Sequence, residues 1–155
     1  METIGSLVSY EVISEQLVPL LVAVALGALI GFERVLARKT AGPRTHALVS
    51  MGAALFVLVG EAVSNAYLGL APLDPVRIAS QIIVGVGFLG AGIIIFRDSQ
   101  LTGLTTASGL WVAAGIGTAA GFKLYPLAIF ATLLTLFIFV VLWYLESRVT
   151  KRNGQ

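Results

Sequence analysis

Two groups of polar residues in this chain combine residue types and spacings that could do chemistry. In the first group, a short connection separates Glu33 and Arg34 from Arg44, Thr45 and His46. A carboxylate and guanidinium groups at this separation can form an ion-pair network that holds two helices in register or docks a partner. A basic loop that only sets the orientation of the chain in a membrane explains the same residues, so both interpretations stay open.

The second group consists of Asp74, Arg77 and Gln81, preceded in the chain by Glu61. An aspartate followed by a proline is typical of a helix start, and the helical spacing places Asp74, Arg77 and Gln81 on one helix face. These residues form either a capped helix with a local ion pair or the mouth of a polar path. Glu61 and Asp74 are the candidates for a metal site, because hydrated Mg²⁺ needs few protein oxygens.

The sequence favours no enzymatic chemistry. Cysteine is absent, His46 is the single histidine, and no nucleophile is spaced for pairing with a base, so we expect no catalytic residues. Gly85, Gly87 and Gly90 match the pattern G-x-G-x-x-G, but they lie inside an apolar run without the strand that a dinucleotide site requires. We therefore expect no resident cofactor other than Mg²⁺, and no enzyme activity.

Long apolar helices must position both groups. Five stretches contain no Asp, Glu, Lys or Arg: 16–32, 45–60, 78–96, 99–122 and 124–145. About 20 apolar residues in a helix cross the hydrocarbon core of a bilayer. The chain is 57% hydrophobic and only 12% charged, whereas soluble domains carry about 25% charged residues. We predict an all-α, polytopic transmembrane bundle with five spans, over about 18–32, 45–64, 78–96, 105–121 and 125–145.

The charge distribution predicts the orientation of these spans. With the N-terminus outside, eight Lys and Arg residues fall in cytoplasmic segments and only Arg77 and Lys123 fall outside. This asymmetry follows the positive-inside rule, so the C-terminus lies in the cytoplasm. The domain prediction is one membrane domain over 1–155, with an outer segment 1–15, five helices within 16–145 and a cytoplasmic tail 146–155. A net charge of +2 distributed in this way indicates topology and no nucleic-acid partner.

Glycines inside the apolar stretches predict close helix packing. Small residues let helices approach each other in lipid, where no hydrophobic force drives them together. The spacing therefore assigns eight glycines to helix packing: Gly27, Gly31, Gly85, Gly87, Gly90, Gly92, Gly117 and Gly121. We expect the third and fourth spans to be central. The bulky fifth span is expected to be peripheral and to face lipid.

Four segments resemble the MgtC/SapB family of bacterial membrane proteins. They are LGALIGFER (26–34), AGPRTHALVSMGAALF (41–56), DPVRIASQIIVGVGFLGAGII (74–94) and GLTTASGLWVAAGIG (103–117), in the family's order. The family's motif positions map onto Glu33, Arg34, Gly42, Arg44, Thr45, Asp74, Arg77, Gln81, Gly87, Gly90, Gly92 and Thr106. The virulence-linked members of the family carry a soluble C-terminal ACT-like domain, so a chain ending at Gln155 is expected to be the short form.

The resemblance implies a multi-pass protein of the bacterial inner membrane that is linked to growth under Mg²⁺ limitation. For the virulence-linked members, the resemblance further implies a regulatory role toward other membrane proteins, including the F-type ATP synthase. Our first hypothesis is a non-enzymatic regulator that contacts membrane partners or further copies of itself within the lipid bilayer. The alternative is a small transporter of Mg²⁺ or another ion, acting as a homo-oligomer. A third hypothesis is a lipid or small-molecule site between the glycine-rich helices.

Overall fold

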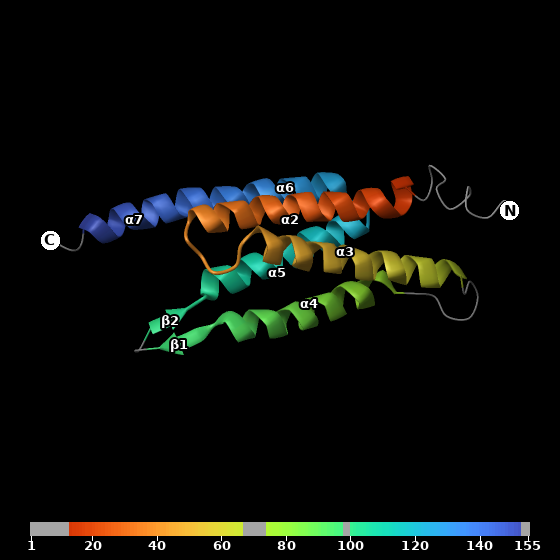
Figure 1. Cartoon of the computed structure of the whole chain (residues 1–155), viewed down its shortest axis with the longest axis horizontal. Coiled ribbons are helices and arrows are strands. Elements are labelled where there is room, and N and C mark those ends of the chain that lie inside the picture. The colour runs from red at the N-terminus through yellow and green to blue at the C-terminus, as the bar shows by residue number, and fades with distance from the viewer. Residues whose placement is uncertain (1–12, 67–73, 98–99, 153–155) are drawn as a thin grey trace.

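The computed structural model describes residues 13–66, 74–97 and 100–152, which form an elongated helical bundle (Figure 1). The predicted outer segment 1–15 therefore lies mostly outside the described residues, as do the last three residues of the predicted tail. The elements in chain order are η2 (Ile13–Leu17), α2 (Val18–Leu36), α3 (Pro43–Ala66), α4 (Pro75–Ile93), β1 (Ile95–Arg97), β2 (Gln100–Thr102), α5 (Leu104–Gly121), α6 (Tyr125–Phe137), η3 (Ile138–Leu142) and α7 (Trp143–Arg152).

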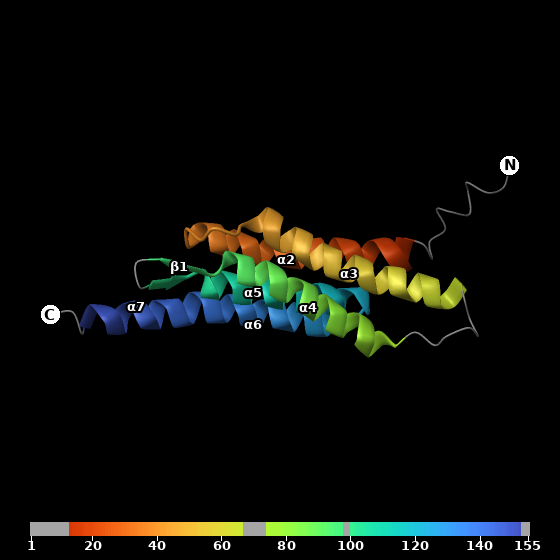
Figure 2. The same cartoon turned by 90° about the horizontal axis from the view of Figure 1, so that it is seen from below.

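The helices make this chain a multi-pass membrane protein. Four segments are long and apolar enough to cross a bilayer: Ser14–Leu36, Pro43–Ser64, Pro75–Ile93 and Tyr125–Arg148. Helix α5, which the sequence predicts as the fourth of five spans, is not among these four. It is 18 residues long, and its many small residues lower its mean hydropathy. Figures 1 and 2 show α5 running along the same long axis as the other helices.

Helix α5 occupies the centre of the bundle. It packs against α2, α3, α4 and α6, and its buried residues are mostly Ala and Gly. Leu110 and Ile116 are the large exceptions, at 1% and 2% exposure. Contacts with four neighbouring helices explain why a short helix of small residues is stable here, since most of its apolar contacts come from protein rather than lipid.

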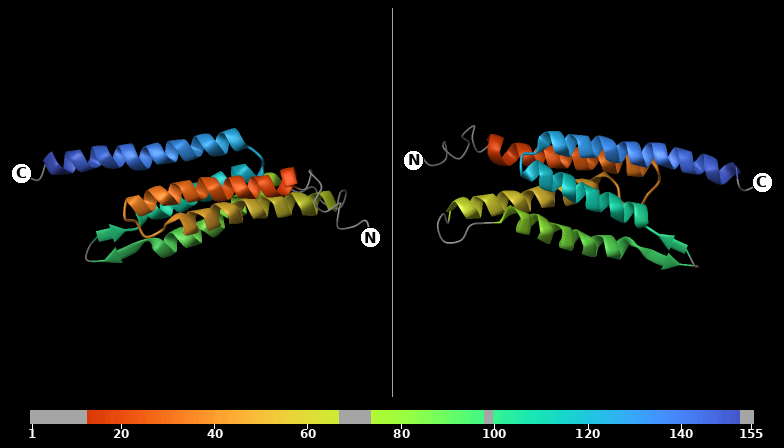
Figure 3. Two further views of the ribbon diagram at one scale, coloured as in Figure 1. Left: turned by 45° about the horizontal axis from the view of Figure 1, so that its top comes forward. Right: turned by 180° about the vertical axis from the view of Figure 1, so that it is seen from behind.

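Helix α4 is peripheral, so the prediction that both the third and fourth spans are central is wrong for the third. It buries Ile82, Val86 and Gly90 and leaves most other residues exposed. Only 11% of its span is buried, against 28% for each of the first two spans. The views in Figure 3 show α4 on the outside of the bundle, away from α2 and α6. Glycine content predicted close packing, but within this chain only one stripe of α4 meets a neighbour.

The glycines of α2 and α5 lie directly against neighbouring backbone. A methyl group added at Gly27 would come 2.7 Å from the His46 oxygen, and one at Gly117 would come 2.6 Å from the Ser50 carbonyl carbon. Similar contacts surround Gly31 and Gly121. Contacts this short leave no room for a side chain, so these positions bring α2, α3 and α5 together.

A short antiparallel hairpin connects α4 to α5. The sequence does not predict this hairpin. Residues Ile95 and Thr102 are paired, as are Phe96 and Leu101. Gly103 follows with φ of 90°, a left-handed conformation that favours glycine, and starts α5. We call the end of the bundle that carries this hairpin the hairpin end, and the opposite end the distal end. Helix α7 ends at the hairpin end and η2 begins at the distal end (Figure 1).

The last helix is continuous from α6 through η3 to α7, beyond the predicted end of the fifth span at residue 145. Most of its large side chains are exposed, as expected for a lipid-facing helix. Its inner face buries Ala128, Thr132, Thr135 and Phe139, and both threonine hydroxyls donate to backbone oxygens one turn back. The η3 segment is a π-helical insertion, a feature that often marks functional positions in helices.

Candidate functional site

The first candidate site is a buried cluster at the hairpin end, centred on Arg34. This residue continues the buried stripe of α2 that contains Ala23, Gly27 and Ile30. Its side chain is only 3% exposed and forms an ion pair with Glu33. Its guanidinium lies 3.5 Å from the centroid of the Phe139 ring. Helix periodicity therefore turns Arg34 into the interior of the bundle.

His46 and Ser50 extend this cluster along α3. Both are fully buried, and they lie one helical turn apart. His46 Nδ1 is 3.0 Å from the Gly42 carbonyl oxygen. His46 Nε2 and Ser50 Oγ have no hydrogen-bond partner among the described residues. We call Glu33, Arg34, His46, Ser50 and Phe139 the buried polar centre.

Gly109 of α5 closes the buried polar centre. A methyl group at this position would lie 3.1 Å from the Phe139 ring and 3.3 Å from His46 Nε2. The absence of a side chain lets the ring and the imidazole approach the same point on α5. This contact joins α2, α3, α5 and the π-helical segment of the last helix in one packed layer.

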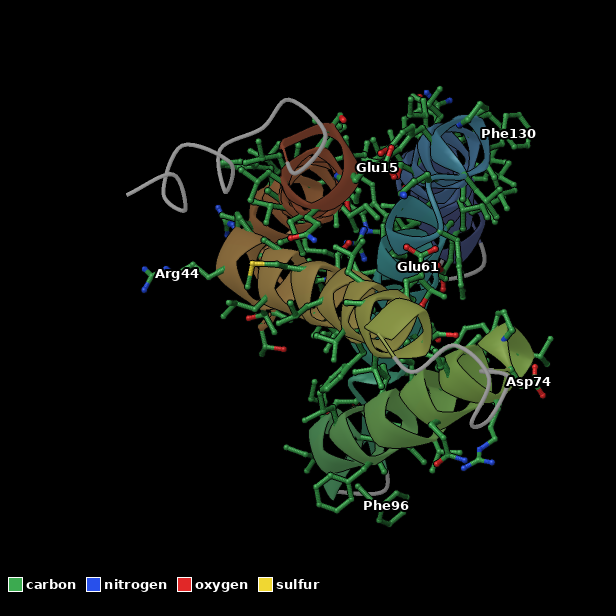
Figure 4. All side chains as sticks on the ribbon, turned by 90° about the vertical axis from the view of Figure 1, so that its right-hand side faces the viewer. Glu15, Arg44, Glu61, Asp74, Phe96 and Phe130 are labelled. Atoms are coloured by element: carbon green, nitrogen blue, oxygen red, sulfur yellow. The ribbon has the colours of Figure 1, made fainter. Side chains whose placement is uncertain are left out.

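Arg44 and Thr45 do not join the buried polar centre. Both are exposed at the start of α3, and Figure 4 shows Arg44 pointing away from the bundle. The predicted ion pair between Glu33 and Arg44 is therefore absent from the described contacts, and Arg34 takes its place. Successive helix residues point in directions about 100° apart, so His46 faces inward where Arg44 and Thr45 face outward.

A second cluster at the distal end is built around Lys123. Its Nζ forms an ion pair with Glu15 and lies 3.9 Å from Glu61 Oε2. The turn after α5 places Lys123, because its φ of 61° ends the helix and its N–H donates to the Ala120 oxygen. The hydrogen bond to Glu15 raises the pKa of Lys123, and the charge of Glu61 raises this pKa further.

Asp74, at the start of α4, lies apart from Glu61 (Figure 4). The Asp74 carboxylate caps α4 by accepting a hydrogen bond of 2.9 Å from the Val76 N–H, as the sequence predicts. Figure 4 shows Glu61 beside α5, whereas Asp74 points outward from the start of α4. The structure therefore does not bring the two candidate metal ligands together. Within residues 13–66, 74–97 and 100–152, no three His, Asp or Glu side chains are grouped to hold a metal ion.

A large groove separates α3 from α4. It has a volume of about 1150 Å³, and most of the residues along it are apolar. Its polar residues gather at the distal end, where Asp74, Arg77, Gln81 and Ser64 line it. Gly52 of α3 and Gly85 of α4 line its walls, and neither has an atom within 4 Å of an added methyl group. We call this feature the α3–α4 groove.

Four residues of the two clusters are not candidates in the sequence analysis. Phe139 lies in the span predicted to face lipid, and Lys123 contributes there only to the predicted topology. Ser50 and Gly109 are not among the predicted polar or packing residues. The signal available for Arg34 was its place in the helical stripe with Gly27 and Ile30. For Phe139 and Lys123, partners distant in sequence define the contact, so no local signal exists.

Comparison with known proteins places this arrangement in a family. The model of the MgtC family matches residues 20–148, which include both clusters apart from Glu15. The chain belongs to the MgtC family. An Escherichia coli K12 protein named "Putative magnesium transporter YhiD" is 44% identical over 139 residues, which cover 86% of this chain and 63% of that protein. "Protein MgtC" of Salmonella typhimurium LT2 is 42% identical over 132 residues, which cover 85% of this chain and 54% of that protein.

This MgtC-family chain thus spans between about half and two thirds of the length of these relatives. An uncharacterized protein of Haemophilus influenzae is 39% identical over 140 residues, with 58% of that protein covered. No solved structure matches the chain. Several motif positions that the resemblance implies can now be located. Glu33 and Arg34 belong to the buried polar centre, Asp74, Arg77 and Gln81 line the α3–α4 groove, and Gly87 and Gly92 occupy exposed positions on α4.

Proposed function

We propose that this chain is a non-enzymatic protein of the bacterial inner membrane that acts in adaptation to Mg²⁺ limitation or envelope stress. It works through helix contacts with membrane partners, which include further copies of itself. In this proposal α5 also crosses the bilayer, as the fourth of five spans, the N-terminus lies outside and the C-terminus lies in the cytoplasm. The two ends of the described chain lie at opposite ends of the bundle, which supports an odd number of spans.

The observation that carries this proposal is the free face of α4. Gly87 has no atom within 4 Å of an added methyl group, and Ala91 is exposed. Gly87 and Ala91 are one helical turn apart, which is the spacing of small residues that lets a second helix approach closely. Elsewhere in the chain, Gly27 and Gly117 lie in close contact with the backbone of α3. A partner helix on α4 would give these small residues the same role.

The interior of the bundle supports a contact role over conduction by one chain. The buried polar centre lies at the hairpin end, and the Lys123 cluster lies at the distal end. Between them, the layer around Ala54, Val57 and Gly121 is packed, and an added methyl group at Gly121 would come 2.8 Å from the Val57 Cβ. A path for a hydrated ion through this layer would require the helices to separate.

Association of the purified full chain tests the proposal. Gly87→Leu places a bulky side chain on the free face of α4, where the open space tolerates it within one chain. Gly85→Leu is the matched control, since it makes the same change on the same helix but toward the α3–α4 groove. We expect the wild type and Gly85→Leu to form a defined oligomer or to retain a membrane partner in mild detergent, and Gly87→Leu to lose it. A wild-type chain that is monomeric and retains no partner would refute the proposal.

The alternative function is transport of Mg²⁺ or another ion by a homo-oligomer. The name of the Escherichia coli relative and the charged residues at the distal end of the α3–α4 groove favour it. In this case the path would run between copies rather than through one bundle. Flux of Mg²⁺ into proteoliposomes that is reduced in Asp74→Asn and Arg77→Gln would support transport. Absence of flux in the reconstituted wild-type oligomer would exclude it.

A further inference from the structure

The α3–α4 groove has the chemistry of a binding site for one phospholipid. Most of its length is lined by apolar side chains such as Val49, Phe56, Ile82 and Leu89. Its charged residues, Asp74 and Arg77, lie together at the distal end. We propose that this groove binds a zwitterionic phospholipid with a phosphoethanolamine headgroup. The phosphate contacts Arg77, the ammonium contacts Asp74 and an acyl chain fills the groove.

Charge complementarity determines the headgroup. The structure describes no ion pair for Arg77, so its planar guanidinium is available for bidentate contact with a phosphate. The Asp74 carboxylate uses Oδ1 to cap α4, and its second oxygen is free to accept from an ammonium. One positive and one negative side chain match a headgroup of one phosphate and one ammonium. An anionic headgroup without an ammonium would meet Arg77 favourably but would be repelled by Asp74.

The size of the groove favours a lipid over a helix. A helix of about 19 residues has a diameter of about 10–12 Å and occupies roughly 2000–3000 Å³. The groove provides about 1150 Å³, so it could enclose only part of a helix, whereas an acyl chain fits within it. Gly52 and Gly85 have no side chains, so they leave room in the groove for a narrow acyl chain. The groove is a different surface from the face of Gly87 and Ala91, so the lipid and a partner helix can bind at the same time.

Five substitutions, two of them controls, test the site in the full chain. Arg77→Gln removes the phosphate contact, and Gly85→Leu fills the groove from α4. Gly87→Leu and Arg44→Gln are the controls, because they make the same changes on exposed surfaces outside the groove. Each protein is purified in mild detergent, incorporated into bilayers of equal phosphatidylethanolamine and phosphatidylglycerol, and analysed for retained lipid by native mass spectrometry.

We expect the wild type to retain one phosphatidylethanolamine in preference to phosphatidylglycerol. Arg77→Gln should reduce that retention about tenfold, as expected for the loss of a charge-assisted contact. Gly85→Leu should abolish it, and both control variants should retain the lipid like the wild type. Asp74→Asn keeps the helix cap, because Asn is an equally good N-cap residue, and should shift the preference toward phosphatidylglycerol.

Three outcomes would overturn the inference. These are equal retention in Arg77→Gln and Arg44→Gln, a wild-type preference for phosphatidylglycerol, and occupation of the groove by a second copy. The last would appear as a dimer that Gly85→Leu converts to a monomer. Because Gly87→Leu reports on partner contacts and Gly85→Leu on lipid, failure of this inference is distinguishable from failure of the proposed function.

Discussion

The substitution Gly117→Ala should separate the central helices of the bundle. The added methyl group would lie 2.6 Å from the Ser50 carbonyl carbon and 2.8 Å from its Cα. Ordinary contacts of this kind are 3.4 Å or longer, so α3 would have to move away from α5. On its other side, α3 meets α2 at Gly27, where an added methyl would lie 2.8 Å from the Ser50 Cβ. Ser50 is thus held between two helices, and its backbone cannot retreat.

The magnitude follows from two opposing contributions. Replacing a helical glycine by alanine favours the helix by about 1 kcal/mol. Overpacking a tight interior costs typically about 1–3 kcal/mol, and more where backbone rather than a side chain must move. Because the Ser50 backbone must move, we take the cost as about 3–4 kcal/mol and expect Gly117→Ala to lower the free energy of unfolding by about 2–3 kcal/mol. Gly115→Ala on the same helix has no neighbour within 4 Å and should change it by less than about 1 kcal/mol.

Unfolding by sodium dodecyl sulfate in mixed micelles, followed by circular dichroism, would measure both values. The expected result is a difference of at least about 2 kcal/mol between the two variants. Equal stability of Gly117→Ala and Gly115→Ala would refute the reasoning. It would mean that α3 and α5 are not in backbone contact at Ser50.

Three further predictions concern the polar clusters and the hairpin. Arg34→Met leaves a partly buried carboxylate without its cation, so it should destabilise by about 3 kcal/mol, whereas Arg44→Met on the surface should change stability by less than about 0.5 kcal/mol. The same micelle titration measures this difference, and equal values would contradict burial of the Arg34 ion pair. Lys123→Met should cost only about 0.5–1 kcal/mol near neutral pH, because this ion pair is partly exposed. The folded state raises the pKa of Lys123, so its contribution is complete below the ordinary pKa of 10.5 and is lost only as pH rises above that value. Stability curves of both proteins should therefore converge in strong base, and convergence already at neutral pH would argue against the pair. Gly103→Ala should destabilise by about 1–2 kcal/mol because of its positive φ, and unchanged thermal unfolding would show that the turn is not left-handed.

Local patterns were sufficient for the membrane helices and several of their boundaries. Asp74 and its proline predicted the start of α4, and the cap is present. The apolar stretches predicted the α3 helix and the last helix, although the latter continues to Arg152. The hairpin was missed, because three residues in each strand give too short a pattern to distinguish from a loop.

Contacts that depend on the packing of the helices could not be predicted from local patterns. Glu33 and Arg44 were expected to pair, but the adjacent Arg34 turns inward and pairs with Glu33 under the Phe139 ring. Glu61 and Asp74 were considered together because both fall between the second and third spans. The fold instead places Glu61 near Lys123, which follows it by 62 positions (123 − 61).

The amino-acid sequence by itself determined that this chain enters a lipid bilayer as helices, because length and apolar composition decide whether a segment is stable in hydrocarbon. Only the tertiary structure decided which helix lies at the centre. Helices α4 and α5 are both rich in small residues, yet α5 packs against four helices whereas α4 is held along one stripe. A small residue permits a neighbouring helix to approach closely, but it does not specify which helix approaches. Which helices become neighbours depends on how all of them pack together.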